Sequence, residues 1–329
     1  PITVRALGAD VEDVAKRALA LAVNGGCVAV IVNTVQRAQE VFQAVRAAYT
    51  GRLRTLHQKG AKDDLCVILF HARYPAEDRE KRENAVLQYL GPQPYVDRKR
   101  GAGDYRPRRM ILIATQVAEQ SLDFDADVMI SDLAPIDLLL QRAGRLHRHS
   151  TNAGRRHAHG EPQLWVAGLD RWPRDAMEQH RWQWVYAPHL LYRSWLALKD
   201  GQQIALHGDL DRLVLRVYGP EEWFGLTDPE RADLDEATAA FQTRLTNEAR
   251  LGDLAHIGDP ERFFNVYPTV TAETDGEPAN DDWPQTRLGE ESLRIVPVYS
   301  AGTGCYLDPS FKSPTHLGHR AGTLSCEQA

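Results

Sequence analysis

The feature that most constrains the fold is an alternation of short, continuously apolar runs with stretches of helical periodicity. The apolar runs, rich in β-branched residues, occupy residues 27–32, 65–70, 110–114 and 128–131. The stretches predicted to be helical are residues 11–23, 35–49, 76–90 and 136–148. Continuous apolar runs are typical of strands buried on both faces of a parallel sheet. Right-handed crossovers then predict an α/β fold in which helices sandwich a parallel sheet.

A change of pattern near residue 160 predicts a second domain. Residues 150–160 read as a flexible stretch, and a strand over residues 163–166 completes the first unit. We therefore expect one domain over residues 1–170 and a smaller α+β domain over residues 171–329, with short strands near 265–270 and 293–298. We expect the tryptophans of this half to fill its core, with base stacking as the alternative. They are Trp172, Trp182, Trp184, Trp195 and Trp223.

Basic side chains are concentrated in the first half of the chain. Residues 1–160 hold 24 basic and 18 acidic side chains, and residues 161–329 hold 15 and 27, which gives net charges of +6 and −12. A polyanion is therefore expected to dock on the first half. Six of the basic residues lie between residues 98 and 109, interrupted by glycine and proline. This predicts a mobile loop that either binds phosphates or a partner, or stays solvated.

Cysteine usage and hydropathy favour a cytoplasmic protein. The four cysteines lie far apart, without the close pairs of a zinc or redox motif. No apolar run approaches the roughly 18 residues of a membrane helix, so we expect no membrane partner. The chain begins at Pro1 rather than at a methionine, and we expect it to be a piece of a longer protein.

Two motifs carry most of the chemical information. Residues 111–123 read ILIATQVAEQSLD, and residues 141–148 read QRAGRLHR after a further buried strand. Arg142 and Arg145 are three residues apart, and on one helix both guanidinium groups would point at a single target. A phosphoryl group in transfer is such a target. Without the upstream motif, two arginines at this spacing would instead indicate a helix face exposed to solvent.

In this order the two motifs resemble motifs five and six of superfamily 2 helicases, which implies a RecA-like lobe. The resemblance implies that Gln141, Arg142 and Arg145 face the nucleotide, and Gly144 would permit close approach of the backbone to phosphate. It also implies that Asp123 approaches the ribose, with a helix cap or surface acid as the alternative. The family's positions for the nucleic-acid backbone match Thr115 and Gln116, at a strand's carboxyl end where ligands bind in open α/β sheets.

Further sequence segments narrow the resemblance from superfamily 2 helicases in general to the helicase-nuclease of type I CRISPR systems. The segments that carry it are residues 70–79 (FHARYPAEDR), 119–123, 132–137 and 146–149, with a fainter likeness over residues 286–290. The resemblance places Asn33, Thr34, His71, Arg73 and Arg79 near the DNA track. It implies an ATP-dependent motor moving 3′ to 5′ on single-stranded DNA, the displaced strand of an R-loop made by an RNA-guided surveillance complex (Cascade).

The chain lacks other parts that such an enzyme needs. No glycine precedes a lysine, so the phosphate-binding loop is missing, as is the histidine-aspartate nuclease motif. ATP and Mg²⁺ are therefore expected on a first RecA-like lobe outside this chain, beside a nuclease domain, and the chain alone is predicted to be inactive as an ATPase. A non-catalytic DNA- or complex-binding module and a general RNA helicase lobe remain alternatives.

The histidine pairs do not predict a metal site. His147 with His149, and His157 with His159, form two His-x-His pairs without flanking carboxylate or thiol ligands at a familiar spacing. These histidines are expected to end a helix and to lie in a loop.

Overall fold

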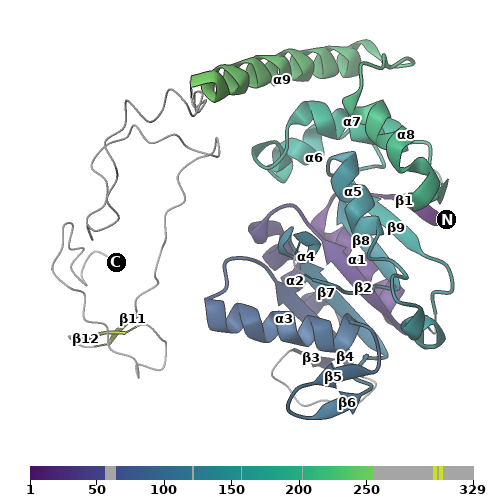
Figure 1. Ribbon diagram of the computed structural model, residues 1–329, viewed down its shortest axis with the longest axis vertical. Helices are drawn as coiled ribbons and strands as arrows, with labels where there is room; N and C mark the ends of the chain where they lie inside the picture. The colour runs from purple at the N-terminus through teal and green to yellow at the C-terminus, as the bar shows by residue number, and fades with distance from the viewer. Residues whose placement is uncertain are drawn as a thin grey trace, which may run out of the picture. The chain divides into compact units, whose positions relative to one another are not determined.

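An eight-stranded sheet forms the centre of the computed structural model, which describes residues 1–55, 64–120, 122–156, 158–201, 203–254, 299–301 and 304–306 (Figure 1). The strand order is β10-β1-β9-β8-β2-β7-β4-β3, and every pairing is parallel except that of β1 with β10. The strands are β1 Ile2–Leu7, β2 Gly26–Ile31, β3 Leu53–Arg54, β4 Leu65–Phe70, β7 Arg109–Ala114, β8 Val128–Asp132, β9 Gln163–Ala167 and β10 Gln203–Ile204. The predicted α/β class with a parallel sheet is confirmed.

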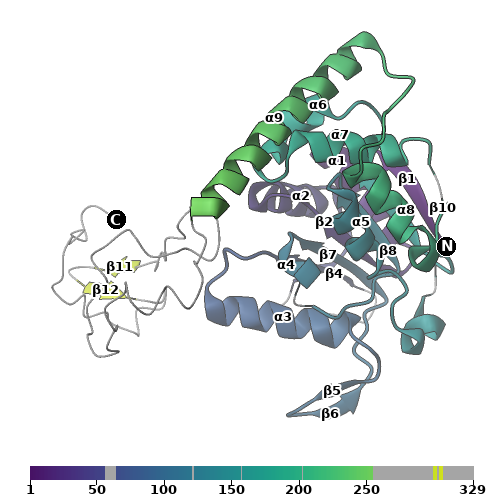
Figure 2. The ribbon, with the colours of Figure 1, turned by 45° about the horizontal axis from the view of Figure 1, so that its top comes forward.

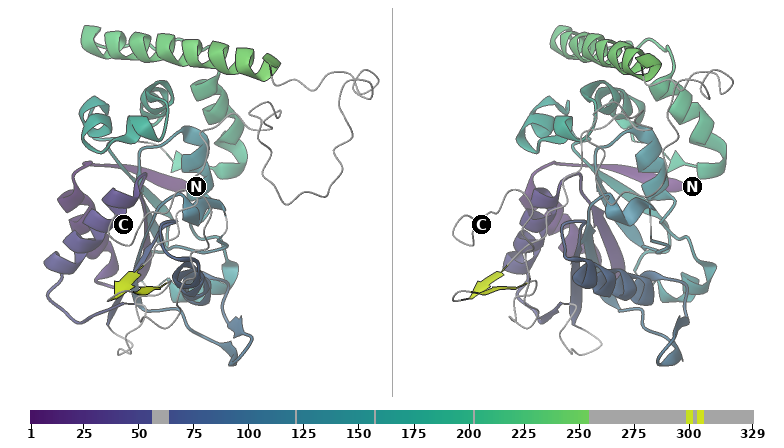
Figure 3. Two further views of the ribbon diagram at one scale, coloured as in Figure 1. Left: turned by 90° about the vertical axis from the view of Figure 1, so that its left-hand side faces the viewer. Right: turned by 60° about the vertical axis from the view of Figure 1, so that its left-hand side comes forward.

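Helices cover both faces of this sheet (Figures 1 and 3). Alternate residues of β2 explain the two layers: Val28 and Val30 pack with α1 and α2, whereas Ala29 and Ile31 pack with α3 and α5. All six residues of β2 are buried, as expected for a central strand. The helices are α1 Val11–Ala22, α2 Val35–Ala48, α3 Ala76–Leu90, α4 Val117–Gln120 and α5 Ile136–Ala143.

The segment after the last parallel strand is mostly helical, and up to Arg244 it belongs to the same compact unit as the sheet. That unit runs from Pro1 to Arg244, and a second unit comprises Leu245–Ala329. The elements of the segment are α6 Arg174–Gln179, η2 Trp182–Trp184, α7 Pro188–Leu198, α8 Leu206–Tyr218 and α9 Asp228–Leu254. The domain division expected at residue 170 stays a prediction. The expected strands at 265–270 and 293–298, and the likeness at 286–290, lie outside the described residues.

Most of the tryptophans of this half fill the core, as expected. Trp182 is completely buried, Trp195 and Trp223 are buried, and Trp172 stacks on Tyr192 with ring centroids 4.5 Å apart. Trp184 differs, because 82% of it is exposed.

Parts of the two segments expected to be mobile, residues 98–109 and 150–160, form regular structure. Residues 95–103 form a hairpin, β5 Tyr95–Asp97 and β6 Gly101–Gly103, which projects from the lobe beyond α3 (Figure 2). Residues Ser150–Arg155 form the 3-10 helix η1. The second unit contains the strands β11 Tyr299–Ala301 and β12 Gly304–Tyr306, which pair antiparallel. In the described part of the chain, no helix is both long and apolar enough to span a bilayer.

Candidate functional site

Several of the predicted site residues lie at the edge where the parallel strands end. β2, β4 and β7 pair in register and stop at the same level. Asn33 and Thr34 follow β2, His71 follows β4, and Thr115 follows β7. Residues up to about 80 positions apart in sequence therefore lie at one edge of the sheet, which is where ligands bind in open α/β folds.

Arg142 lies in α5, and its side chain is completely buried. Its Nε donates to Oε1 of Glu119 over 2.7 Å, Nη1 donates to Oγ of Ser131 over 2.8 Å, and Nη2 donates to the hydroxyl of Tyr186 over 3.2 Å. The Glu119 side chain is 4% exposed. Arg142 thus ties α4, β8 and the segment before α7 together rather than pointing outward. Its catalytic role stays a prediction, and the structure gives its guanidinium internal partners at the open end of the strands.

The helix that holds Arg142 ends earlier than the sequence indicates. α5 stops at Ala143, whereas the pattern predicted a helix to residue 148. The chain turns because the N–H of Ala126 donates to the carbonyl of Arg145 over 2.9 Å, and the N–H of His147 donates back to Ala126 over 3.1 Å. The argument that two arginines share one helical face is therefore wrong, since only Arg142 is in the helix.

Arg145, Arg148 and Asp123 form an accessible group that we call the arginine cluster. The exposed side-chain fractions are 16% for Arg145, 43% for Arg148 and 55% for Asp123. Arg145 donates from Nη2 to the carbonyl of Glu119 over 2.8 Å, and its Nη1 lies 3.8 Å from Oδ1 of Asp123. Arg148 donates from Nε to the same carboxylate oxygen over 2.5 Å. Arg148 was not among the predicted residues, although its position three residues after Arg145 is a signal that could have found it.

Two further predicted nucleotide residues border this cluster. Gln141 is exposed on α5. Gly144 caps the helix with a φ of −63°, and a Cβ added there would lie 3.2 Å from the carbonyl oxygen of Gln141. The backbone conformation at Gly144 is thus one that any residue adopts, and the roles of both residues stay predictions.

Asn33 and Thr34 have their polar groups engaged within the lobe. Asn33 is 2% exposed, its N–H donates to Oδ2 of Asp132 over 3.0 Å, and its Oδ1 lies 3.4 Å from Nη2 of Arg142. Thr34 caps α2, because its Oγ1 accepts the N–H of Arg37 over 3.2 Å. Of the two, only Thr34 is accessible enough to reach a ligand.

His71 is buried against a ring rather than against polar atoms. It stacks on Tyr74 with centroids 4.1 Å apart, and Arg82 covers the same tyrosine ring at 3.6 Å. Neither ring nitrogen of His71 has a hydrogen-bond partner among the described residues. Burial, then the charges of Arg82 and Arg73, lower the pKa of His71. Arg73 is exposed and Arg79 is half-buried, so of these predicted DNA residues Arg73 is the most accessible.

Thr115 and Gln116 meet the same network from the end of β7. Thr115 is 3% exposed. Gln116 donates from Nε2 to the carbonyl of Asn33 over 2.8 Å and lies 3.3 Å from the hydroxyl of Tyr186. Burial raises the pKa of Tyr186, so this hydroxyl stays neutral. Tyr186 and Glu119 are site residues that motif spacing did not predict, because their roles arise from tertiary contact with Arg142.

A second buried arginine ties the segment after residue 170 to the lobe. Nε of Arg37 lies 2.9 Å from both carboxylate oxygens of Asp132, and its Nη1 lies 3.1 Å from Nδ1 of His180. Its guanidinium also lies 5.6 Å from the ring centroid of Trp182. The ends of β2 and β8 and the segment around η2 therefore share one polar network.

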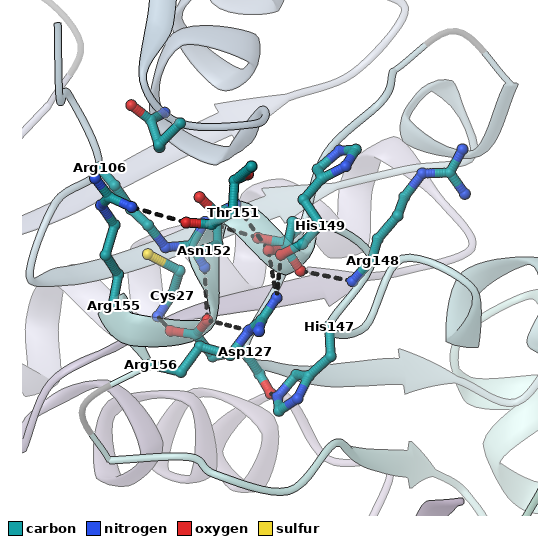
Figure 4. A network of polar contacts seen from close by, with 12 residues as sticks. Cys27, Arg106, Asp127, His147, Arg148, His149, Thr151, Asn152, Arg155 and Arg156 are labelled. Carbon is teal, nitrogen blue, oxygen red and sulfur yellow. Dashed lines mark hydrogen bonds and ion pairs between the residues drawn. The ribbon is translucent and has the colours of Figure 1, made fainter.

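The opposite edge of the sheet holds a second buried network (Figure 4). The arginine cluster borders it, because the N–H of Arg148 donates to Oδ1 of Asp125 over 2.9 Å. Asp127 accepts from Nη2 of Arg106 over 2.5 Å and from the N–H of Cys27 over 2.8 Å. Arg156 donates to Asp125 over 2.7 Å, and its Nε lies 3.7 Å from Asp127. Burial raises the pKa of the Cys27 thiol to about 12. Arg106 and Arg156 therefore anchor the segment after the β5–β6 hairpin and the segment after η1. Arg106 is not solvated, whereas Arg98, Lys99 and Arg100 of the same basic segment are exposed.

Replacing Asp127 by asparagine is expected to lower the free energy of unfolding by about 1–3 kcal/mol. Asparagine keeps the size of the side chain, but it leaves the charged guanidinium of Arg106 beside a neutral group. The Arg106 side chain is 2% exposed, so water cannot take over the lost interaction. Asp104→Asn is the matched control, because Asp104 is 54% exposed where it pairs with Arg155. Urea unfolding of both variants measures the difference, and equal unfolding midpoints would contradict the structural role of the network.

Comparison with known proteins identifies the type of lobe. Residues 24–151 match the family model described as CRISPR-associated nuclease/helicase Cas3, C-terminal. The chain is 33% identical over 337 residues to the CRISPR-associated endonuclease/helicase Cas3 of Thermus thermophilus, covering 92% of this chain and 35% of that protein. It is 41% identical over 134 residues to the Escherichia coli Cas3, covering 41% of this chain and 13% of that protein. The chain thus spans about a third or less of these relatives.

Solved structures agree with the sequence relatives. A crystal structure of T. fusca Cas3 with ADP matches with a TM-score of 0.68 and 30% identity, covering 95% of this chain and 32% of that chain. A chain of a CRISPR RNA-guided surveillance complex in a pre-nicking state matches with a TM-score of 0.54 and 29% identity, covering 80% and 29% of the two chains. The resemblance predicted from the sequence is confirmed.

Proposed function

We propose, from the Cas3-like helicase lobe that this chain carries, that the chain is the C-terminal part of an ATP-dependent translocase on single-stranded DNA in CRISPR antiviral defence. The rest of that protein would be a first RecA-like lobe, which binds ATP with Mg²⁺, and a nuclease domain. The hydrolysis of ATP would supply the free energy of movement. The substrate would be the displaced strand of an R-loop, and the partner would be an RNA-guided surveillance complex (Cascade).

The observation that carries the proposal is the arginine cluster, which lies between α4 and the segment that follows α5. Arg145 is partly exposed, and its contacts are a backbone carbonyl, the exposed Asp123 and the ring of Phe124, whose centroid lies 5.8 Å from the guanidinium carbon. A guanidinium held this way can exchange those partners for phosphate oxygens contributed from across an interface. Buried Arg142 fixes Glu119, which in turn positions Arg145 through its carbonyl. In this proposal Arg142 is a positioning residue, and Arg145 with Arg148 reaches the nucleotide.

The nucleic-acid side of the proposal rests on the edge of the sheet where the parallel strands end. Thr34 and Arg73 are accessible there, and the first half of the chain carries a net charge of +6. Backbone contacts from threonine hydroxyls, arginine and main-chain N–H groups recognise nucleic acid without reading its sequence. A motor that moves along a strand of any sequence needs this kind of contact.

A binding and turnover experiment on the 329-residue chain tests this function. We expect the chain to bind a labelled single-stranded DNA oligonucleotide with an affinity that falls as salt rises, because phosphate contacts release counterions. We expect negligible ATP turnover by the chain alone, and DNA-stimulated turnover once an N-terminal ATP-binding lobe is joined to it.

Three other outcomes of this experiment would contradict the proposal or assign a different function. Robust DNA-stimulated hydrolysis by the isolated chain would overturn the division of labour between two lobes. Binding and turnover with RNA in preference to DNA would indicate a general RNA helicase lobe. DNA binding without turnover even in the joined protein would indicate a non-catalytic binding module, which the missing glycine-lysine pair favours.

A further inference from the structure

A hollow of about 690 Å³ lies beside the start of α2 and is not explained by the arginine cluster. Its walls come from the start of α2 with the residue before it, from Arg73 in the turn after β4, and from the segment between the end of α6 and α7. The lining residues used below are Thr34, Glu40, Arg73, Arg181 and Trp184. Because Thr34 and Arg73 follow the ends of β2 and β4, the hollow opens at the edge of the sheet proposed to hold nucleic acid.

Trp184 presents an aromatic ring to this hollow instead of to the core. It is 82% exposed, whereas Trp182, two residues earlier in the same short helix, is completely buried. Tryptophans bury large apolar areas when they can, and the exposure of this one leaves its ring free to stack on a ligand.

The backbone that places Trp184 is itself strained. Arg181 has a φ of 57°, one of two non-glycine residues in the left-handed region among the described residues. That conformation costs roughly 1–3 kcal/mol and persists where surrounding contacts enforce it, often at functional sites. Here the neighbours His180 and Trp182 are fixed by Arg37 and by the core. The left-handed turn is where the chain leaves those anchors and brings Trp184 out to the surface.

The charges around the ring favour a polyanion. Arg73 and Arg181 are exposed, and no carboxylate of the described residues pairs with either of them. Glu40 is the one acid among the lining residues, and it accepts a hydrogen bond from Gln36 over 2.8 Å. An exposed aromatic ring flanked by arginines is the arrangement by which proteins bind single strands, with bases on the ring and phosphates on the cations.

We propose that Trp184 is a stacking platform for one base of a bound single strand, with Arg73 and Arg181 contacting the neighbouring phosphates. The inference rests on the proposed function and adds to it a base-binding position outside the two helicase motifs. Stacking on an aromatic ring tolerates every base, because every base has a π-face. The platform would therefore grip the strand without sequence preference, as a translocase requires.

The test compares two oligonucleotides of equal length, one of thymidines and one of abasic sites, on the full 329-residue chain. The wild type is expected to bind the thymidine strand more tightly, by about 5- to 150-fold, the range measured for one stacked base. Trp184→Ala is expected to lose this preference while binding the abasic strand like the wild type. Trp184→Phe should retain most of the preference.

Phe224→Ala is the matched control, because Phe224 is an aromatic residue of the same unit that is 79% exposed and does not line the hollow. Thermal unfolding of each variant verifies that the fold is intact. If Trp184→Ala keeps the preference for bases, the platform is overturned and the proposed function stands. If the wild type binds neither strand, the proposed function itself fails. If Trp184→Ala weakens binding to an RNA-guided surveillance complex but leaves binding to both oligonucleotides unchanged, the ring contacts a protein partner. That result would equally overturn the platform.

Discussion

Replacing Arg142 by alanine is expected to lower the free energy of unfolding by about 3–5 kcal/mol. The change leaves the carboxylate of Glu119, 4% exposed, without its charged partner, and breaking a buried pair by removing one side has a cost of this size. Ser131 and Tyr186 lose a hydrogen-bond donor at the same time. Urea unfolding of the 329-residue chain measures the loss as a lower midpoint.

Two further variants separate the buried charge from other effects. Arg148→Ala removes an arginine whose partner Asp123 is 55% exposed, and we expect a loss of at most about 1 kcal/mol. The double change Arg142→Met with Glu119→Leu removes both charges and should recover much of the stability lost by Arg142→Ala. A wild-type midpoint for Arg142→Ala would show that Glu119 does not depend on this arginine.

The arrangement of strands was predictable because it depends on local sequence. Continuous apolar runs indicated β2, β4, β7 and β8, and these strands are central and buried on both faces. β1, at Ile2–Leu7, was not predicted, because it is partly exposed and owes its place to pairing with β9 more than 150 residues later. Long-range pairing of this kind leaves no local signal.

The meeting of several candidate residues at one edge of the sheet was also predictable, whereas the direction of each side chain was not. Parallel strands bring their carboxyl ends to one edge, so residues after three different strands had to meet. Whether Arg142 or Arg145 points outward depends on Glu119, which lies in a separate short helix. The burial of Arg106 likewise depends on Asp127, 21 positions later. Charge patterns in the sequence do not reveal such partners.

Arg145→Ala is expected to reduce ATP turnover by roughly 10³- to 10⁵-fold, the range that an arginine reaching a phosphoryl group contributes in other nucleotide hydrolases. The free energy of unfolding of this variant should change little, because the Arg145 side chain contacts one backbone carbonyl, an exposed acid and, at 5.8 Å from the centroid, the ring of Phe124. Arg145→Lys is the matched variant: it keeps the charge but loses the planar fork that binds two oxygens, so an intermediate rate is expected.

The most direct test of the account is the steady-state ATP turnover of Arg145→Ala, in a protein that joins this chain to an N-terminal ATP-binding lobe, at saturating single-stranded DNA. We predict that turnover falls by at least about a thousandfold, while the affinity for DNA and the unfolding midpoint match those of the unaltered protein. Turnover at the unaltered rate, or a fall that merely follows weaker DNA binding, would contradict the claim that this lobe delivers Arg145 to the nucleotide.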